Sequence, residues 1–307
     1  MRNRLRVGAR GFKATPACPL MLVVLMTALL ANSTTGAQRL DANDRGGELA
    51  ASVINDPELA SGFSLLYELK FEQARQHFTN LEQAQPAQPI GPALEAASNL
   101  FEELYRNGVL TSEFFLDDKR SPGGIKDQPD SDLERQFSAN AQRAEELARA
   151  RLENQPKDPD ALFALALVAG MQADDLFLIQ KRELESLRHL READRNARIL
   201  LGVAPDADDA YVVMGAANYI IGCLPSYKRA MLRVGGAHGN KTLGMQELSR
   251  GASSEHAHYL RPFARLMLAL AALRERNAKL AQQQLQELVM EFPENPLFAA
   301  ELAKITV

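Results

Sequence analysis

The amino-acid sequence predicts an all-α protein built from repeated helix pairs, and three observations support this prediction. Ala and Leu, which lose little conformational freedom in a helix, are abundant, and Trp is absent from the 307 residues. A small residue, a small or apolar residue four positions later and a proline eight positions further on recur together four times. Apolar residues between 184 and 200 keep the spacing of a helix face.

The recurring spacing defines where the helices end and what they contact. Its four occurrences are Ala74, Phe78 and Pro86; Ala144, Ala148 and Pro156; Ala193, Ala197 and Pro205; and Ala281, Leu285 and Pro293. Two residues four apart lie on one helix face, and the proline stops the helix. We therefore expect each unit to end as a helix with a small, buried contact point. Small residues on the neighbouring helices, such as Gly62 and Ala269, would let the helix axes approach closely.

This pattern resembles the tetratricopeptide repeat (TPR). The unit at 55–88 and the unit at 262–295 match it best, and the first carries Gly62, Phe71, Ala74, Phe78 and Pro86 in the family's places. The resemblance implies two antiparallel helices per unit of about 34 residues, stacked into a superhelical solenoid. It covers most of the chain from 55 to 300, in about five units.

The middle units depart from the repeat through two inserted loops and one long helix. The stretch at 111–132 is rich in Pro, Gly and Asp, and 223–240 interrupts the fourth unit, so both are expected to be loops. The expected helices around them are, in order, 92–107, 133–154, 160–172 and a long one at 175–201, with a short capping helix after Asn295.

The N-terminus has the pattern of a secretory signal peptide at 1–37. Five basic residues precede an apolar run at 20–31, and a small, polar stretch ends at Ala37, where we expect cleavage. The alternative is an uncleaved membrane anchor, but the apolar run has 12 residues and a bilayer needs about 20. Residues 38–54 would form an N-terminal arm and 55–307 the helical domain, in the periplasm or secreted, with no stable membrane span after cleavage.

Charge and cysteine content restrict the function further. Without the five basic residues of 1–37, 30 Lys and Arg remain of 35, against 39 Asp and Glu. So acidic a chain is a poor candidate for binding nucleic acid, which requires cations to neutralise phosphates. Cys223 would be the single remaining cysteine, so packing alone must stabilise the exported protein.

No catalytic, cofactor or metal motif stands out. The chain has no Gly-rich phosphate loop of the required form and no G-x-S-x-G sequence. His256 and His258 are two residues apart, whereas helical metal ligands need spacings of three or four. Cys223 follows an apolar run and is expected to be a buried, inert thiol. We therefore predict a protein that is not an enzyme and holds no cofactor or metal.

A cluster of cations within the second inserted loop is the first candidate binding site. It comprises Tyr227, Lys228, Arg229 and Arg233, followed by three glycines at 235, 236 and 239. One interpretation is a site for a carboxylate or phosphate group, held by the forked donors of Arg. The other is a short amphipathic helix whose cations are solvated.

The second candidate site comes from the resemblance. In TPR proteins the first helix of each unit lines the concave surface, which here would be unusually apolar for a solvent-facing groove. The residues carried over are Phe63, Tyr67, Phe101, Phe163, Met171 and Tyr219. Such a groove is typical of a binding site, unless Phe114, Phe115 and Leu116 or the long helix fill it.

These observations predict an exported binding or scaffold protein whose groove accepts a peptide segment or helix of a partner in the cell envelope. The alternative is a carrier of a small amphipathic or organic acid. That alternative is similar, by analogy of fold and compartment only, to the periplasmic TPR-like component of some TRAP-type transporters. An enzyme is a third class, which would need catalytic residues brought together from distant units.

Overall fold

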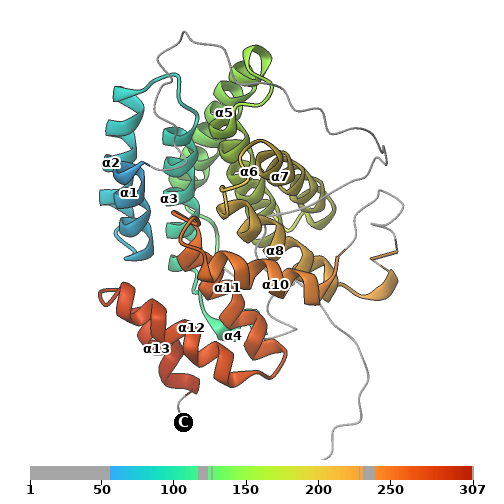
Figure 1. Ribbon diagram of the computed structural model, residues 1–307. Helices are drawn as coiled ribbons and strands as arrows, with labels where there is room; N and C mark the ends of the chain where they lie inside the picture. Colours follow the sequence, from blue (N-terminus) through green and yellow to red (C-terminus); the bar gives the residue numbers. More distant parts are fainter. Residues whose placement is uncertain (1–55, 117–123, 126, 228, 231–238, 306–307) are drawn as a thin grey trace, which may run out of the picture.

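The computed structural model describes residues 56–116, 124–125, 127–227, 229–230 and 239–305, and these residues form helices connected by turns, without a β-strand. The all-α prediction is thus confirmed for this part of the chain (Figure 1). The expected signal peptide at 1–37 and the arm at 38–54 lie outside the described residues and stay predictions.

The helices follow one another with short connections. They are α1 (Pro57–Tyr67), α2 (Phe71–Ala84), α3 (Ile90–Arg106), α4 (Ser112–Leu116), α5 (Ser131–Asn154), α6 (Pro159–Asp174) with the π-turn η3 (Asp175–Ile179), α7 (Glu183–Val203), α8 (Asp209–Cys223), α10 (Lys241–Ser253), α11 (Arg261–Arg274), α12 (Ala278–Glu291) and α13 (Pro296–Ile305). The expected helix at 160–172 therefore continues to Ile179, and the long helix begins at Glu183 rather than 175. The apolar residues 176–178 are buried with α6, which explains the shift.

The prolines of the recurring spacing end helices as expected. Pro86, Pro156, Pro205 and Pro293 each come two residues after the last residue of α2, α5, α7 and α12. A proline disfavours the helical conformation of the residue before it, which accounts for the constant distance. The alanines that precede them are fully buried, with no exposed surface at Ala74, Ala144, Ala193 and Ala281.

Each helix packs against the next, and alternate helices form an inner layer. Besides the sequential contacts, α3 packs on α6, α6 on α8, and α8 on α11. Of the inner helices, α6 buries 14 of its 16 residues and α8 buries 14 of 15, whereas α2, α5, α7 and α12 bury one face. A helix that is apolar all round belongs in a core. The long apolar side chains of the inner layer therefore face one another.

The end of the first helix, α1, meets the turn between α12 and α13. The Tyr67 and Phe292 rings lie 5.3 Å apart between centroids, and Asn295 Nδ2 donates to the Tyr67 carbonyl at 2.7 Å. On the other side of α1, the Asp56 backbone N–H donates to the Tyr259 hydroxyl at 2.7 Å. Figure 1 shows the blue and red ends of the chain side by side. The arrangement thus encloses space between its inner helices.

Among the described residues, one helical segment, Pro159–Ile179, has the length and apolar composition to cross a membrane. Neighbouring helices bury 89% of its apolar window. The core helix of a globular protein has the same properties, so this segment indicates nothing about a membrane.

Candidate functional site

An apolar cavity lies where the inner helices face one another. It has a volume of about 130 Å³, and of its 24 lining residues all but four have hydrocarbon or thioether side chains. The lining comes from α1, α2, α3, α4, α6, α8, α11 and α13 and from four connections between helices. Its large apolar and aromatic side chains are Phe63, Leu66, Tyr67, Leu69, Phe71, Leu94, Phe101, Leu110, Phe115, Leu167, Met171, Leu260, Phe263, Leu266, Met267, Leu270, Leu297 and Phe298.

On each inner helix, the residues that line the cavity have the spacing of a single helix face. On α3, Leu94, Ala97 and Phe101 are three and four positions apart, so they share a face. Phe263, Met267 and Leu270 on α11 and Leu167, Met171 and Asp174 on α6 follow the same rule. The cavity is therefore a product of aligned helix faces, not of a single loop.

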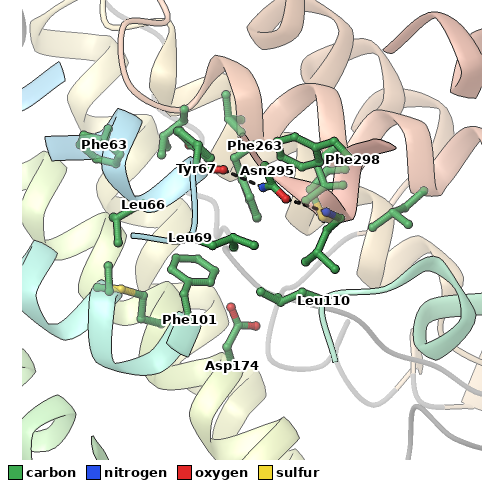
Figure 2. A pocket seen from close by; sticks show the side chains of 18 of the residues that line it. Phe63, Leu66, Tyr67, Leu69, Phe101, Leu110, Asp174, Phe263, Asn295 and Phe298 are labelled. Atoms are coloured by element: carbon green, nitrogen blue, oxygen red, sulfur yellow. Dashed lines mark hydrogen bonds between the residues drawn. The ribbon is translucent and has the colours of Figure 1, made fainter. Parts of the chain in front are cut away.

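The polar groups of the lining are few and largely occupied within the protein. Figure 2 shows Asn295 bridging two backbone groups: its Nδ2 donates to the Tyr67 carbonyl, and its Oδ1 accepts from the Leu297 N–H at 2.8 Å. The Tyr67 hydroxyl donates to the Tyr259 carbonyl at 2.9 Å. Burial raises the pKa of Tyr67, so its hydroxyl stays neutral. These bonds join the first hairpin to the last while leaving the cavity apolar.

Two carboxylates complete the polar lining. Glu301 on α13 accepts a hydrogen bond from the Ser112 hydroxyl and one from Lys304 Nζ at 2.8 Å. Asp174, on α6, is 3% exposed, and in Figure 2 its carboxylate points toward the space beside Phe101 and Leu110.

Short helix α4 covers one side of the cavity. It lies within the stretch expected to be a loop, and its Phe114 and Phe115 are buried at 6% and 7% exposure. The Ser112–Glu301 hydrogen bond and the donation from Arg274 Nη1 to the Phe115 carbonyl at 3.1 Å hold it. Phe115 lines the cavity wall, so α4 caps the predicted groove without filling it.

A second, smaller cavity of about 40 Å³ adjoins the first. Phe115, Met267 and Leu270 line both, so the two cavities lie on either side of the same three side chains. The remaining residues of the second cavity are Leu116, Tyr219, Ile220, Cys223, Ala271 and Arg274. Of these, Leu116 is 38% exposed.

A buried carboxylate fixes the turn that supports α1. Asp209, at the start of α8, accepts hydrogen bonds from the backbone N–H groups of His258, Tyr259 and Leu260 at 3.1, 3.1 and 2.6 Å. Burial raises the pKa of Asp209 to about 7, against the opposing effect of these donors. The fixed Tyr259 ring stacks on Phe63 at 5.1 Å and so positions one wall of the cavity.

The residues predicted for the groove divide between three places. Phe63, Tyr67, Phe101 and Met171 all line the main cavity, although they come from three different helices. Tyr219 lines the second cavity instead, where its hydroxyl donates to Glu275 at 3.1 Å. Phe163 does not line the main cavity; it is 2% exposed and packs against the Tyr259 ring at 5.9 Å.

Of the predicted cationic cluster, the two described residues, Tyr227 and Arg229, do not line either cavity. Tyr227 is 62% exposed, and Arg229 is partly buried. Lys228 and Arg233 lie outside the described residues. The interpretation of this cluster as an anion site therefore stays a prediction.

Sequence reasoning missed the contributions of the chain's last helix and of the turns. Asn295, Phe298 and Glu301 reach the cavity only because the ends of the chain meet, and no local pattern signals such a contact. Asp174 could have been predicted from the sequence, because an acid three residues after Met171 continues an apolar helix face.

Comparisons with known proteins add no family to this description. No protein-family model matches the chain, and no curated protein matches it. Among the described residues, no group of three His, Cys, Asp or Glu side chains is placed to hold a metal ion. The functional argument therefore depends on the cavity.

Proposed function

We propose that this protein is a carrier that encloses a small, largely apolar molecule in the cavity between its inner helices. The observation that carries this proposal is the apolar cavity of about 130 Å³ between the inner helices, whose lining includes the hydrogen-bonded pair Tyr67 and Asn295. An engineered apolar cavity of about 150 Å³ in another protein stays dry and binds benzene. A single ring or a short alkyl chain is thus the right size.

The energetic cost of the cavity supports a function for it. At roughly 24 cal/mol per Å³, an empty space of this volume costs about 3 kcal/mol of stability. Larger side chains at Ala97 or Val213 would fill part of the space. A protein that needed only a packed core would gain stability from such residues, whereas a carrier must keep the space for its ligand.

The size of the cavity favours a small molecule over a peptide. An α-helix with its side chains is about 10 Å wide, far more than this cavity admits. The predicted peptide-binding scaffold would require the first hairpin to separate from Phe292 and Asn295. Protein binding in the cell envelope is therefore the second candidate, and capture of a partner only by a variant with these contacts removed would favour it.

The proposal includes the finer architecture and the compartment. Sequential helix packing with an inner series α3, α6, α8 and α11 supports a TPR-like arrangement that curls until its ends meet. The pattern of residues 1–37 supports export. Together they are similar in kind to the periplasmic TPR-like component of some TRAP-type transporters, an analogy of fold and compartment.

Calorimetric titration of the purified protein with octanol tests the proposal. We expect saturable binding at one site. Ala97→Leu, which adds three carbon atoms to the cavity wall, should weaken this binding at least tenfold, because the added side chain occupies the ligand's space.

The matched control is Ala150→Leu, the same change at an exposed position of α5, which should bind octanol as the unaltered protein does. Absence of octanol binding, or equal binding by the Ala97→Leu variant, would overturn the carrier proposal. Thermal unfolding of each variant shows whether it folds.

A further inference from the structure

We propose that the ligand of the main cavity is a neutral molecule with a single aromatic ring, and that Phe101 and Phe263 bind this ring. The inference rests on the proposed function and names the ligand class of the same cavity. It decides between a ring and a short alkyl chain, which the volume of the cavity admits equally well.

Phe101 and Phe263 differ from the other aromatic residues that line the cavity. These others are Phe63, Tyr67, Phe71, Phe115 and Phe298. Each of the five has a second ring of the protein beside it, at a centroid distance between 5.1 and 6.2 Å. Among the described residues, Phe101 and Phe263 have no such neighbouring ring. Since aromatic rings gain energy from edge-to-face or offset contact with one another, these two can gain it from a ligand.

The two rings border the cavity from different helices. Phe101 belongs to α3 and Phe263 to α11, and Figure 2 shows them on different sides of the space. Both side chains line the cavity, and both are only partly buried although they belong to inner helices. A ring in the cavity can therefore contact aromatic surface of the protein that no other ring covers.

Two thioethers strengthen the preference for a ring. Met267 lies four residues after Phe263, so it shares the cavity face of α11, and Met171 lines the cavity from α6. A thioether sulfur near the edge of an aromatic ring makes a favourable contact that an alkyl chain cannot offer. The leucines of the lining suit both kinds of ligand, so the two phenylalanines and the two methionines decide between them.

The charged groups of the lining require a neutral ligand. In the described part of the chain they are Asp174 and Glu301, which are 3% and 5% exposed. A ligand carboxylate would lose its hydration and meet like charge there. A ligand ammonium would find no free counter-charge, because Glu301 accepts hydrogen bonds from Ser112 and Lys304, and Asp174 also has a partner.

Calorimetric titration of the full chain with benzyl alcohol and cyclohexylmethanol tests the preference for an aromatic ring. The two probes share a seven-carbon skeleton and a hydroxyl group. The saturated ring has the larger apolar surface, so burial alone would favour cyclohexylmethanol. We expect benzyl alcohol to bind about fivefold more tightly, because only its ring makes aromatic contacts. Benzoate and benzylamine, titrated at about pH 7, should bind at least tenfold more weakly than benzyl alcohol.

Phe101→Leu and Phe263→Leu keep the wall apolar but remove one ring each. Each variant should bind benzyl alcohol no more tightly than cyclohexylmethanol. The matched control is Phe137→Leu, because Phe137 on α5 is buried and has no neighbouring ring among the described residues, yet does not line the cavity. This variant should keep the preference of the unaltered protein, even if it lowers stability.

The outcomes separate this inference from the carrier proposal. If octanol binds but benzyl alcohol has no advantage over cyclohexylmethanol, the inference fails and the carrier proposal stands. If both leucine variants keep the advantage, the assignment of Phe101 and Phe263 is wrong. Tighter binding of benzoate or benzylamine than of benzyl alcohol overturns the neutral ligand. If neither octanol nor any of the four ring compounds binds, the carrier proposal itself fails. The comparison of probes on the unaltered protein needs no variant, so misfolding of a variant does not affect it.

Discussion

Helix α8 has two sides that pack in opposite ways: one touches α10, and the other faces the central cavity. On the side of α10, Gly215 and Gly244 bring the two backbones together: a Cβ at Gly215 would lie 2.6 Å from the Leu248 backbone N. On the side of the cavity, α8 presents Val212 and Val213 to an open space. One face leaves no room for a methyl group, and the other leaves room for a ligand.

This difference indicates where the fold is rigid and where the proposed carrier would exchange its ligand. Small residues fix the distance between neighbouring helices, because backbone atoms cannot move aside as side chains do. Large side chains around the cavity meet across space and can adjust their rotamers. We call the Gly215–Gly244 contact the glycine contact. Substitutions in it should affect folding, and substitutions around the cavity should affect binding.

The largest effect is expected for Gly244→Ala, which tests the rigidity of the glycine contact. The added Cβ would overlap the Tyr219 backbone N and lie 2.7 Å from the Gly215 carbonyl oxygen, so the helices must separate. We expect a loss of about 3 kcal/mol in the free energy of unfolding, the upper part of the range for overpacking. Urea denaturation followed by circular dichroism measures it.

Gly202→Ala is the matched control, because Gly202 is an exposed helical glycine with no atom within 4 Å of an added Cβ. Alanine has the higher helix propensity, so this variant should gain up to about 1 kcal/mol. Similar effects of the two substitutions would show that the helices do not approach as closely as described.

The next largest effect is on the pH dependence of the free energy of unfolding, to which a buried acid of α7 contributes. Asp194 on α7 is fully buried, and burial raises its pKa from 3.8 to about 6, against the hydrogen bond from Arg198. Since the folded state holds the proton more tightly than the unfolded state, Asp194 favours folding below about pH 4, and this contribution is lost as pH rises through about 6. Asp194→Asn should reduce the loss of stability between these limits by about 2 kcal/mol.

Urea denaturation at about pH 4.5 and about pH 8 gives this difference for each protein. The control is Asp132→Asn, at an exposed acid of α5, which should keep the pH dependence of the unaltered chain. A variant at Asp194 with an unchanged pH dependence would mean that Arg198 fully compensates the burial of its carboxylate.

The sequence predicted the helix ends and the small buried residues better than the cavity, and the reason is physical. Helix ends and small buried residues follow from local rules: Pro86, Pro156, Pro205 and Pro293 stop helices, and Ala74 and Ala193 must be small where helices touch. The helix boundary near 175 was wrong, because an apolar segment buried by its neighbours cannot be distinguished from a new helix by periodicity.

The cavity could be predicted only in part. Phe63, Tyr67, Phe101 and Met171 line the cavity, and the family resemblance had predicted them for a concave surface formed by the first helices of the expected units. The contact between α1 and the turn before α13 depends on how all the helices between them pack in succession. Asn295 and Glu301 therefore could not be assigned from the sequence.

The smallest effect, Tyr67→Phe, tests whether the contact between the ends keeps the cavity closed. The change removes only the hydroxyl that donates to the Tyr259 carbonyl and keeps the ring against Phe292, so stability should fall by about 1 kcal/mol. Because the lost bond joins α1 to the turn before α11, we expect faster amide hydrogen exchange in α1 and faster dissociation of octanol. The same substitution at Tyr105, whose side chain is 39% exposed, should change neither rate. Unchanged exchange in α1 would show that ring packing and the Asn295 hydrogen bond are sufficient to hold α1 in place.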